Sequence, residues 1–224
     1  DANHPSPHGL RVDQRAYGSA DPDRDDFVIL EYRIHTQGSG TLAGLYAAVA
    51  CDFRTVNWNE NDTRDYAGTD SARTLAYCKA TPETTALGIR PIWPRGMGGW
   101  ANCIFHDTHI SNGFTKAEKM GFMDGTLRQT TGTTQGNWHA MVSSGPYTIP
   151  AADSQIVAFV LVGGRTVNGM LVNSDTALEW YDPPVAVEEP REPSGPVRGL
   201  SVHPRIFTDG FAISYQLERI EPVV

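Results

Sequence analysis

Glycine and proline interrupt this chain too often for long helices. Its 224 residues include 22 Gly and 15 Pro, and many Thr, Asn and Asp residues accompany them. Residues of these types form turns and end helices. Short apolar or alternating segments lie between the turns, as in strands. The sequence therefore predicts a mainly all-β fold that contains one or two short helices.

Roughly eight to ten segments have the length and pattern of strands. The clearest is 154–162, SQIVAFVLV, where β-branched residues and Phe follow one another as in a central buried strand. Segment 27–35 begins apolar and then alternates. Short strands separated by turns favour a β-sandwich of the jelly-roll type. The other strand candidates are 10–18, 41–53, 73–79, 86–92, 101–105, 139–142 and 147–149.

Two segments have the spacing of helices. Residues 167–181 place apolar side chains three and four positions apart, and Pro183-Pro184 ends this helix. Residues 115–123 predict a shorter helix. The acidic, Asn-rich stretch 54–70 and the Thr-, Gly- and Gln-rich stretch 126–137 are predicted loops.

A composition change near residue 182 divides the chain. Residues 183–199 are rich in Pro and charge, which is typical of an extended linker. The sequence thus predicts a sandwich domain over 1–182, a linker over 183–199 and a C-terminal strand segment over 200–224. A single strand cannot bury its apolar face alone. We therefore expect this segment to pair with another element or molecule, through an assembly strand with the alternating residues Phe211, Ile213, Tyr215 and Leu217.

Charge and hydropathy exclude two classes of partner. The chain has 18 Lys+Arg against 26 Asp+Glu, a net charge of -8, and this dispersed acidic surface predicts no nucleic-acid binding. The longest apolar run, Ile156 to Val162, is far shorter than the roughly 18 residues that a membrane span needs. No export signal opens the chain. We expect Asp1 to be a processed or dissected start.

The three cysteines do not have the spacing of a zinc site. In an oxidising compartment, three cysteines would form one disulfide and leave one thiol. We expect the pair to be Cys51 with Cys78, and Cys103 to remain free. The alternative is three buried free thiols that pack as small hydrophobes.

The segment from Asp52 to Asp70 carries hard oxygen ligands of the kind that calcium prefers. It does not match the EF-hand spacing, and the alternative is a solvated acidic loop. Calcium is the one cofactor that the sequence suggests. Asn61 also begins an Asn-Asp-Thr glycosylation sequon. The calcium candidates are Asp52, Asn59, Asn61, Asp65 and Asp70.

Candidate catalytic groups do not form a recognisable constellation. Ser143-Ser144-Gly145 lacks the first Gly of a nucleophile elbow, so a turn before the next strand is expected. His106 and His109 flank Asp107 without a third metal ligand. Glu31 lies on a strand without the second carboxylate that glycoside hydrolysis requires. The sequence therefore predicts no enzyme activity.

Several segments, read in order, resemble a β-rich domain of secreted proteins from Bacteroidetes and related phyla. The resemblance covers roughly residues 9–182 and rests on RVDQRAYG, DDFVILEYRI, LAGLYAAVACDF, LGIRPI, SSGPYTIPAADSQIVAFVLVGG and GMLVNSDTALEWYD. Such domains occur in surface proteins and in large exported peptidases. The family pattern has paired aspartates after the second strand. Here Asp52 is kept and the second position is Arg54, which weakens a calcium site carried over from the family.

The C-terminal segment LSVHPRIFTDGFAISYQL resembles the opening of the type IX secretion sorting tail. In that tail a Pro-Asn-Pro-Phe turn precedes an alternating strand, and here the turn reads Pro204-Arg205-Ile206-Phe207. The resemblance implies a secreted, cell-surface protein. Asp-Ser-Ala and Asp-Thr-Ala triplets also resemble the O-glycosylation sites of such bacteria, at Ser71 and Thr176.

These features lead to three functional hypotheses. The first is a non-catalytic, extracellular structural or adhesive domain, in one version a surface-filament subunit that self-associates by strand addition. The second is an accessory domain of a larger secreted hydrolase, such as a peptidase, with neighbouring domains as its partners. The third is a carbohydrate-binding module, because Trp58, Trp93 and Trp100 lie in loop-like contexts where aromatic rings can stack on sugars.

Overall fold

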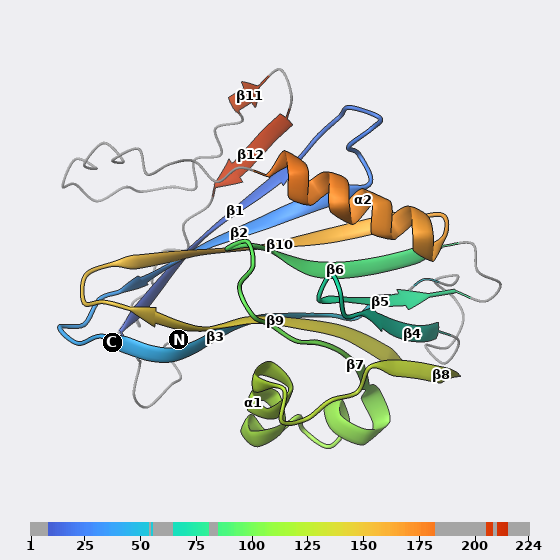
Figure 1. Cartoon of the computed structure of the whole chain (residues 1–224), viewed down its shortest axis with the longest axis horizontal. Helices are drawn as coiled ribbons and strands as arrows, with labels where there is room; N and C mark the ends of the chain where they lie inside the picture. The colour runs from blue at the N-terminus through green and yellow to red at the C-terminus, as the bar shows by residue number, and fades with distance from the viewer. Residues whose placement is uncertain are drawn as a thin grey trace, which may run out of the picture.

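The computed structural model describes residues 9–53, 55, 65–80 and 85–181, and the backbone of two strands at 205–207 and 210–214. It is a sandwich of two antiparallel sheets, one of nine strands and one of three (Figure 1). The mainly-β sandwich that the sequence predicts is confirmed. The two sheets are unequal, so the large sheet is not covered along its whole width.

The large sheet contains most of the strands. From one edge to the other it runs β11 (Arg205–Phe207), β12 (Gly210–Ser214), β1 (Leu10–Gly18), β2 (Phe27–Thr36), β10 (Ser154–Gly164), β6 (Ala86–Trp93), β5 (Leu75–Lys79), β4 (Asp65–Asp70) and β8 (Thr131–Gly136). The most apolar strand, β10, lies between β2 and β6. It is therefore a central strand, as its sequence predicts.

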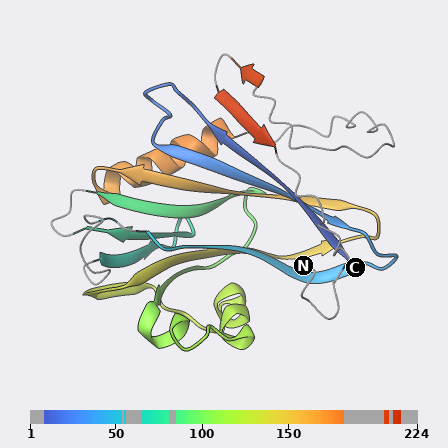
Figure 2. The ribbon, with the colours of Figure 1, turned by 180° about the vertical axis from the view of Figure 1, so that it is seen from behind.

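The small sheet and the helices complete four layers. The small sheet runs β3 (Leu42–Cys51), β9 (Trp138–Ile149) and β7 (Ala101–Phe105). Helix α2 (Val167–Trp180) covers the outer face of the large sheet, whereas α1 (Lys116–Asp124) and the π-helical turn η1 (His106–Ile110) lie outside the small sheet. Figure 2 shows the same order of layers from behind.

Each gap between layers holds an apolar core. The largest core lies between the two sheets and includes Ile34, Ile89, Val142 and Phe159. A second core packs α2 on the large sheet through residues such as Met170. The third is small and lies under α1. Both helices therefore bind the sandwich through buried apolar side chains, which is the expected source of their stability.

Both predicted helices form at the expected places. Helix α1 starts with a capping box, in which Thr115 accepts from the backbone N–H of Glu118 and Glu118 accepts from that of Thr115. The helix ends at Gly125, whose φ of 81° is the left-handed conformation that glycine favours. Thr166 caps α2 by accepting from the backbone N–H of Gly169. These caps fix the ends that the sequence spacing predicts.

Strands β4 and β8 lie in the two stretches that the sequence predicts as loops. Their segments, DYAGTD and TGTTQG, lack a regular apolar alternation. Gly132 and Gly136 let the rings of Trp138 and Phe105 lie against the backbone of β8. These contacts with buried rings hold β8 in the sheet, although its sequence lacks an alternating apolar pattern.

The predicted turn at Ser143-Ser144-Gly145 is wrong. Strand β9 runs through it as one segment of 12 residues. Gly145 has a φ of 138°, which favours glycine, and the register with β3 shifts nearby. The Oγ of Ser143 donates to the carbonyl of Met123 at 2.8 Å, and Ser144 is hydrogen-bonded to Tyr147. These buried hydroxyls have structural partners within the fold.

Candidate functional site

Strand β1 lies at the margin of the described domain and is only partly paired on its outer side. Leu10–Tyr17 pair with β2, whereas only Arg15–Gly18 pair with β12. Within the described residues, no strand pairs with Leu10–Asp13 on that side. Unpaired backbone N–H and C=O groups of an edge strand are a template for a further strand.

A buried carboxylate fixes β1 to the rest of the fold. Glu31 of β2 is 1% exposed and accepts hydrogen bonds from the phenols of Tyr17 at 3.1 Å and Tyr181 at 2.7 Å. Arg15 lies 3.9 Å from the other carboxylate oxygen. One side chain of β2 therefore joins β1 to the residue that follows α2.

The two phenols remain hydrogen-bond donors over a wide pH range. Burial and the negative charge of Glu31 raise the pKa of Tyr17 to about 12. Burial and the hydrogen bond to Glu31 raise the pKa of Tyr181 as well. A protonated phenol can donate to a carboxylate. The network therefore stays intact at neutral pH.

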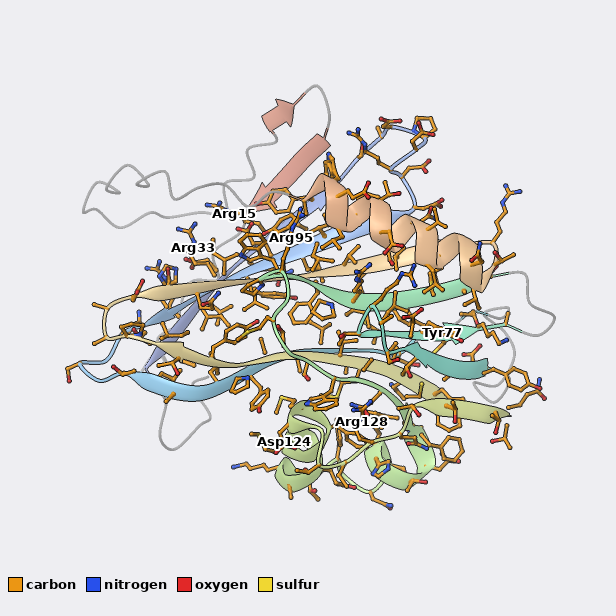
Figure 3. The ribbon with its side chains drawn as sticks, viewed as in Figure 1. Arg15, Arg33, Tyr77, Arg95, Asp124 and Arg128 are labelled. Carbon is orange, nitrogen blue, oxygen red and sulfur yellow. The ribbon has the colours of Figure 1, made fainter. Side chains whose placement is uncertain are left out.

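The chain leaves the sandwich domain next to β1. The rings of Tyr17 and Tyr181 are 6.2 Å apart. Arg95 donates to the carbonyls of Leu178 and Tyr181, at 3.0 and 3.3 Å. Figure 3 shows Arg15 and Arg95 on this side of the large sheet. The segment that contains β12 thus follows an anchored exit point beside the strand with which it pairs.

Two valines on the inner face of this margin are exposed. Val12 is 54% exposed and Val28 is 42% exposed. Val12 lies opposite Ile34, which belongs to the core between the sheets, and Val28 is six residues before Ile34 on the same face of β2. The small sheet therefore leaves Val12 and Val28 exposed, whereas Leu10 of β1 packs against the core between the sheets. Val12 thus lies beside the part of β1 that β12 does not pair with, and Val28 lies at the other end of the two strands.

The outer face of β1 is ionic in contrast. Asp13 accepts from Arg11 at 3.0 Å and contacts His35 at 2.9 Å. These groups are partly exposed, so each pair contributes little to stability. The side chains of Arg11, Asp13 and His35 therefore make the outer face of β1 and β2 polar.

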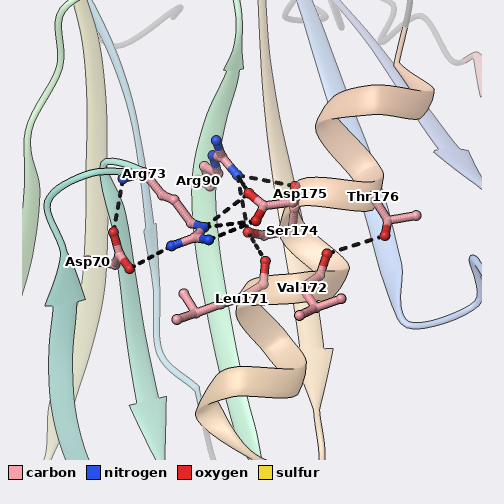
Figure 4. Close-up of polar contacts among 8 residues, drawn as sticks. All are labelled: Asp70, Arg73, Arg90, Leu171, Val172, Ser174, Asp175 and Thr176. Carbon is pink, nitrogen blue, oxygen red and sulfur yellow. Dashed lines mark hydrogen bonds and ion pairs between the residues drawn. The ribbon is translucent and has the colours of Figure 1, made fainter.

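A separate ionic network holds the middle of α2 on the large sheet (Figure 4). Asp175 of α2 binds Arg73 at 2.8 Å and Arg90 at 2.7 Å. Arg90 also donates to the hydroxyl of Ser174 at 3.2 Å, and Arg73 binds Asp70 at 3.0 Å. The hydrogen bonds from Arg73 and Arg90 lower the pKa of Asp175. The network joins α2 to β6 and to the turn after β4.

This network includes both aspartates of the predicted O-glycosylation triplets. Asp70 and Asp175 bind the same guanidinium, that of Arg73. Ser71 is exposed in the turn after β4. Thr176 is partly buried on α2, where its hydroxyl donates to the carbonyl of Val172 at 3.2 Å. Ser71 is therefore the more accessible of the two candidates, and modification of either one stays a prediction.

The calcium candidates do not converge on one point. Asp65 and Asp70 stand at opposite ends of β4, about 17 Å apart along an extended strand. They cannot bind the same ion. Asp52 is exposed at the end of β3, while Asn59 and Asn61 lie outside the described residues. No group of three or more potential metal ligands occurs in the described part of the chain, and calcium at the remaining candidates stays a prediction.

The predicted disulfide is absent, and all three cysteines are free thiols. Cys51 of β3 and Cys103 of β7 both lie opposite Ala140 of β9. Cys78 of β5 donates to the carbonyl of Trp138 at 3.5 Å. All three pack in the core between the sheets. Burial raises the pKa of Cys51 to about 11 and of Cys103 to about 12, so they act as small hydrophobes.

The two histidines around Asp107 have different partners. His106 stacks on His139, with 3.1 Å between Nδ1 and Nε2. His109 binds Glu118 at 2.9 Å, and this bond and that from Thr115 lower the pKa of Glu118 to about 2. His139 and Glu118 could not be predicted as partners, because neither belongs to the HDTH motif. The histidines support η1 and the start of α1.

The two tryptophan candidates for sugar stacking that the structure describes, Trp93 and Trp100, have part of their rings covered by other side chains. Trp58 lies outside the described residues. Trp93 is half-buried and packs edge-on against Tyr181 at 6.4 Å. Trp100 is 38% exposed, but the guanidinium of Arg128 lies 4.3 Å over its ring, on the side of the small sheet seen in Figure 3. A sugar would have to displace Arg128 to stack there.

Comparisons with known proteins give no family. No protein-family model matches this chain, and no curated protein sequence matches it. The resemblance to secreted Bacteroidetes proteins therefore stays a prediction. Among the helices in the described ranges, none has the length and apolar character to cross a membrane.

Proposed function

We propose that this protein is a non-catalytic, extracellular structural or adhesive domain that joins neighbouring molecules by strand addition at β1. The observation that supports this most is the pairing of β12 with Arg15–Gly18 of β1. In this pairing, the edge of β1 carries a strand from the segment after the Pro-rich stretch, which supports the proposal. In the assembled state, we propose, the β12 that fills this edge comes from another copy.

The length of the connection is compatible with exchange between copies. Twenty-three residues separate Tyr181 from Arg205, and a stretch of this length has a maximal reach of about 80 Å. The same strand can therefore reach the edge of its own domain or that of a neighbour. Because β12 would make the same contacts with β1 whichever copy supplies it, exchange between copies costs little free energy.

The surroundings of the edge favour assembly. The exposed Val12 and Val28 beside β1 offer apolar area that a neighbouring molecule would bury, at about 25 cal/mol per Å². The Glu31 network holds β1 in position before the partner strand arrives. Preorganisation of this kind lowers the ordering cost of binding. Secretion and surface display, as the resemblance implies, belong to this proposal.

The experiment compares assembly of the full chain with that of a strand-breaking variant. Ala212→Pro/Ile213→Pro removes two successive backbone donors from β12. Successive N–H groups of a strand point to opposite neighbours, so one of the two substitutions affects pairing with β1. We expect concentration-dependent oligomers of the wild type in sedimentation velocity and negative-stain micrographs, and a monomer of the variant.

The matched control is Ala212→Val/Ile213→Val, which keeps both donors and favours strands. It should assemble like the wild type. Wild-type protein that stays monomeric at all concentrations would contradict the proposal. So would oligomers of the proline variant equal to those of the wild type. Either result would favour the alternative, an accessory domain of a larger secreted hydrolase.

A further inference from the structure

A shallow concavity of about 340 Å³ lies where β4, β5 and β8 are side by side. Its size is at the lower end of the range for small-molecule sites. It lies at the opposite end of the large sheet from β1 and β12. The lining residues are Tyr66, Ala67, Gly68, Thr69, Tyr77, Lys79, Thr131, Gly132 and Thr133.

The strand register explains why the surface is hollow and aromatic. Gly68 of β4 lies opposite Tyr77 of β5, and Tyr66 lies opposite Lys79. A Cβ atom at Gly68 would be 2.4 Å from the phenol oxygen of Tyr77, so this ring lies across the glycine. Figure 3 shows Tyr77 at this end of the sheet. The absence of a side chain at Gly68 gives the concavity a floor that includes an aromatic ring.

Hydroxyl groups surround this floor. On β8, Thr131 lies opposite Gly68, and Thr131 and Thr133 are both exposed. Together with the phenols of Tyr66 and Tyr77, they provide hydroxyls that donate and accept hydrogen bonds. Lys79 adds an ammonium donor and is the one charged residue among those that line the concavity.

This chemistry fits one class of ligand. A cation is disfavoured because no carboxylate lines the concavity, and a purely apolar ligand would cover the hydroxyls of Thr131 and Thr133 without offering them hydrogen bonds. A pyranose ring has C–H groups that stack on an aromatic face and hydroxyls that exchange hydrogen bonds with Thr, Tyr and Lys. We infer that this concavity binds a pyranose unit of a glycan. Binding itself does not depend on the proposed assembly.

The test uses the full chain and ligand-observed saturation-transfer NMR. The probes are maltotriose, cellotriose, mannotriose and galactotriose as neutral sugars, and trigalacturonate as an acidic one, each at millimolar concentration. We expect saturation transfer to at least one probe. Tyr66→Ala should weaken this binding about tenfold, and Thr133→Val about three- to tenfold, the effect of one hydrogen bond.

Control variants separate binding from folding. Thr134→Val changes the next residue of the same strand, which does not line the concavity, and should leave affinity unchanged. Tyr77→Phe keeps the ring over Gly68 and should retain most of the affinity. Lys79→Gln distinguishes acidic from neutral sugars as ligands, because it should weaken the binding of an acidic sugar far more than that of a neutral one.

Two results would overturn the inference. One is no saturation transfer to any of the five probes by folded wild-type protein. The other is binding that Tyr66→Ala and Thr133→Val leave unchanged while their circular dichroism remains that of the wild type. Sedimentation of these variants is a separate readout, so failure of the glycan site and failure of strand addition are distinguishable.

Discussion

Replacing Glu31 by leucine should lower the free energy of unfolding by about 2–4 kcal/mol, because two phenols lose their acceptor at about 1–3 kcal/mol each. The substitution leaves the partly buried phenol of Tyr17 and the buried phenol of Tyr181 without their acceptor. Each unsatisfied group adds a desolvation cost. Urea unfolding, monitored by circular dichroism, measures the change.

Two further variants test the cause. Glu31→Gln keeps the shape and one acceptor oxygen, so it should cost about 1–2 kcal/mol. In Glu31→Leu/Tyr181→Phe one orphaned phenol is gone, and the double variant should be more stable than the sum of the single effects predicts. Additive losses, or a loss below about 1 kcal/mol for Glu31→Leu, would contradict this account of the network.

The same network predicts a loss of stability at alkaline pH. The folded-state pKa of Tyr17, about 12, lies above its ordinary value of 10.0. The folded protein therefore holds this proton more tightly than the unfolded chain does. The stabilisation is complete below pH 10 and is lost as the pH rises towards 12. Glu31→Leu should weaken this dependence, because one cause of the raised pKa is removed.

Replacing Asp175 by asparagine should destabilise the protein by about 2 kcal/mol. This is less than the loss on breaking a fully buried ion pair, because the side chain of Asp175 is 41% exposed. Arg90, with a side chain that is 10% exposed, loses its charged partner. Asp70→Asn is the matched control. It removes a carboxylate from Arg73 alone, and Arg73 keeps Asp175, so the expected loss is below about 1 kcal/mol.

The loss of stability that Asp175→Asn causes should depend on pH. The pKa of Asp175 is lowered below its ordinary value of 3.8. The contribution of this carboxylate is therefore present above pH 3.8 and is lost as the pH falls through the lowered pKa. Unfolding of both proteins at pH 7 and at pH 3 measures this. An equal difference at both pH values, or equal losses for both aspartates, would contradict the role assigned to Asp175.

Local patterns predicted the elements with strong periodicity. Strand β10 and helices α1 and α2 have apolar runs or spacings that suit only one kind of element. Strands β4 and β8 lack such a pattern. In β8, two glycines admit the rings of Trp138 and Phe105, and in β4, Gly68 admits the ring of Tyr77. These contacts depend on the folded structure and are not visible in the segments themselves.

The candidate site was harder to predict for the same reason. Glu31 looks isolated in the sequence, yet its partners are Tyr17, 14 residues away, and Tyr181, 150 residues away. The alternating pattern at the C-terminus did indicate a strand that needs a partner, and β12 pairs with β1. The alternating pattern identifies a strand, but it carries no information on whether the strand pairs within its own chain or with another copy.

The most direct test of strand addition is a disulfide trap between two different molecules. Ala16 of β1 lies opposite Ile213 of β12, and such partners have Cα separations of about 4.5–5.5 Å, within the range of disulfides. Ala16→Cys protein is mixed with Ile213→Cys protein and oxidised. The off-register control mixes Ala16→Cys with Ala212→Cys, because adjacent positions of a strand face opposite sides of a sheet.

If β12 is exchanged between copies, the mixture should give a cross-linked dimer of about twice the 24.5 kDa mass of one chain, and the control mixture and the wild type should not. The account is contradicted if the mixture gives no dimer while the double variant, Ala16→Cys/Ile213→Cys, closes its disulfide within a single chain.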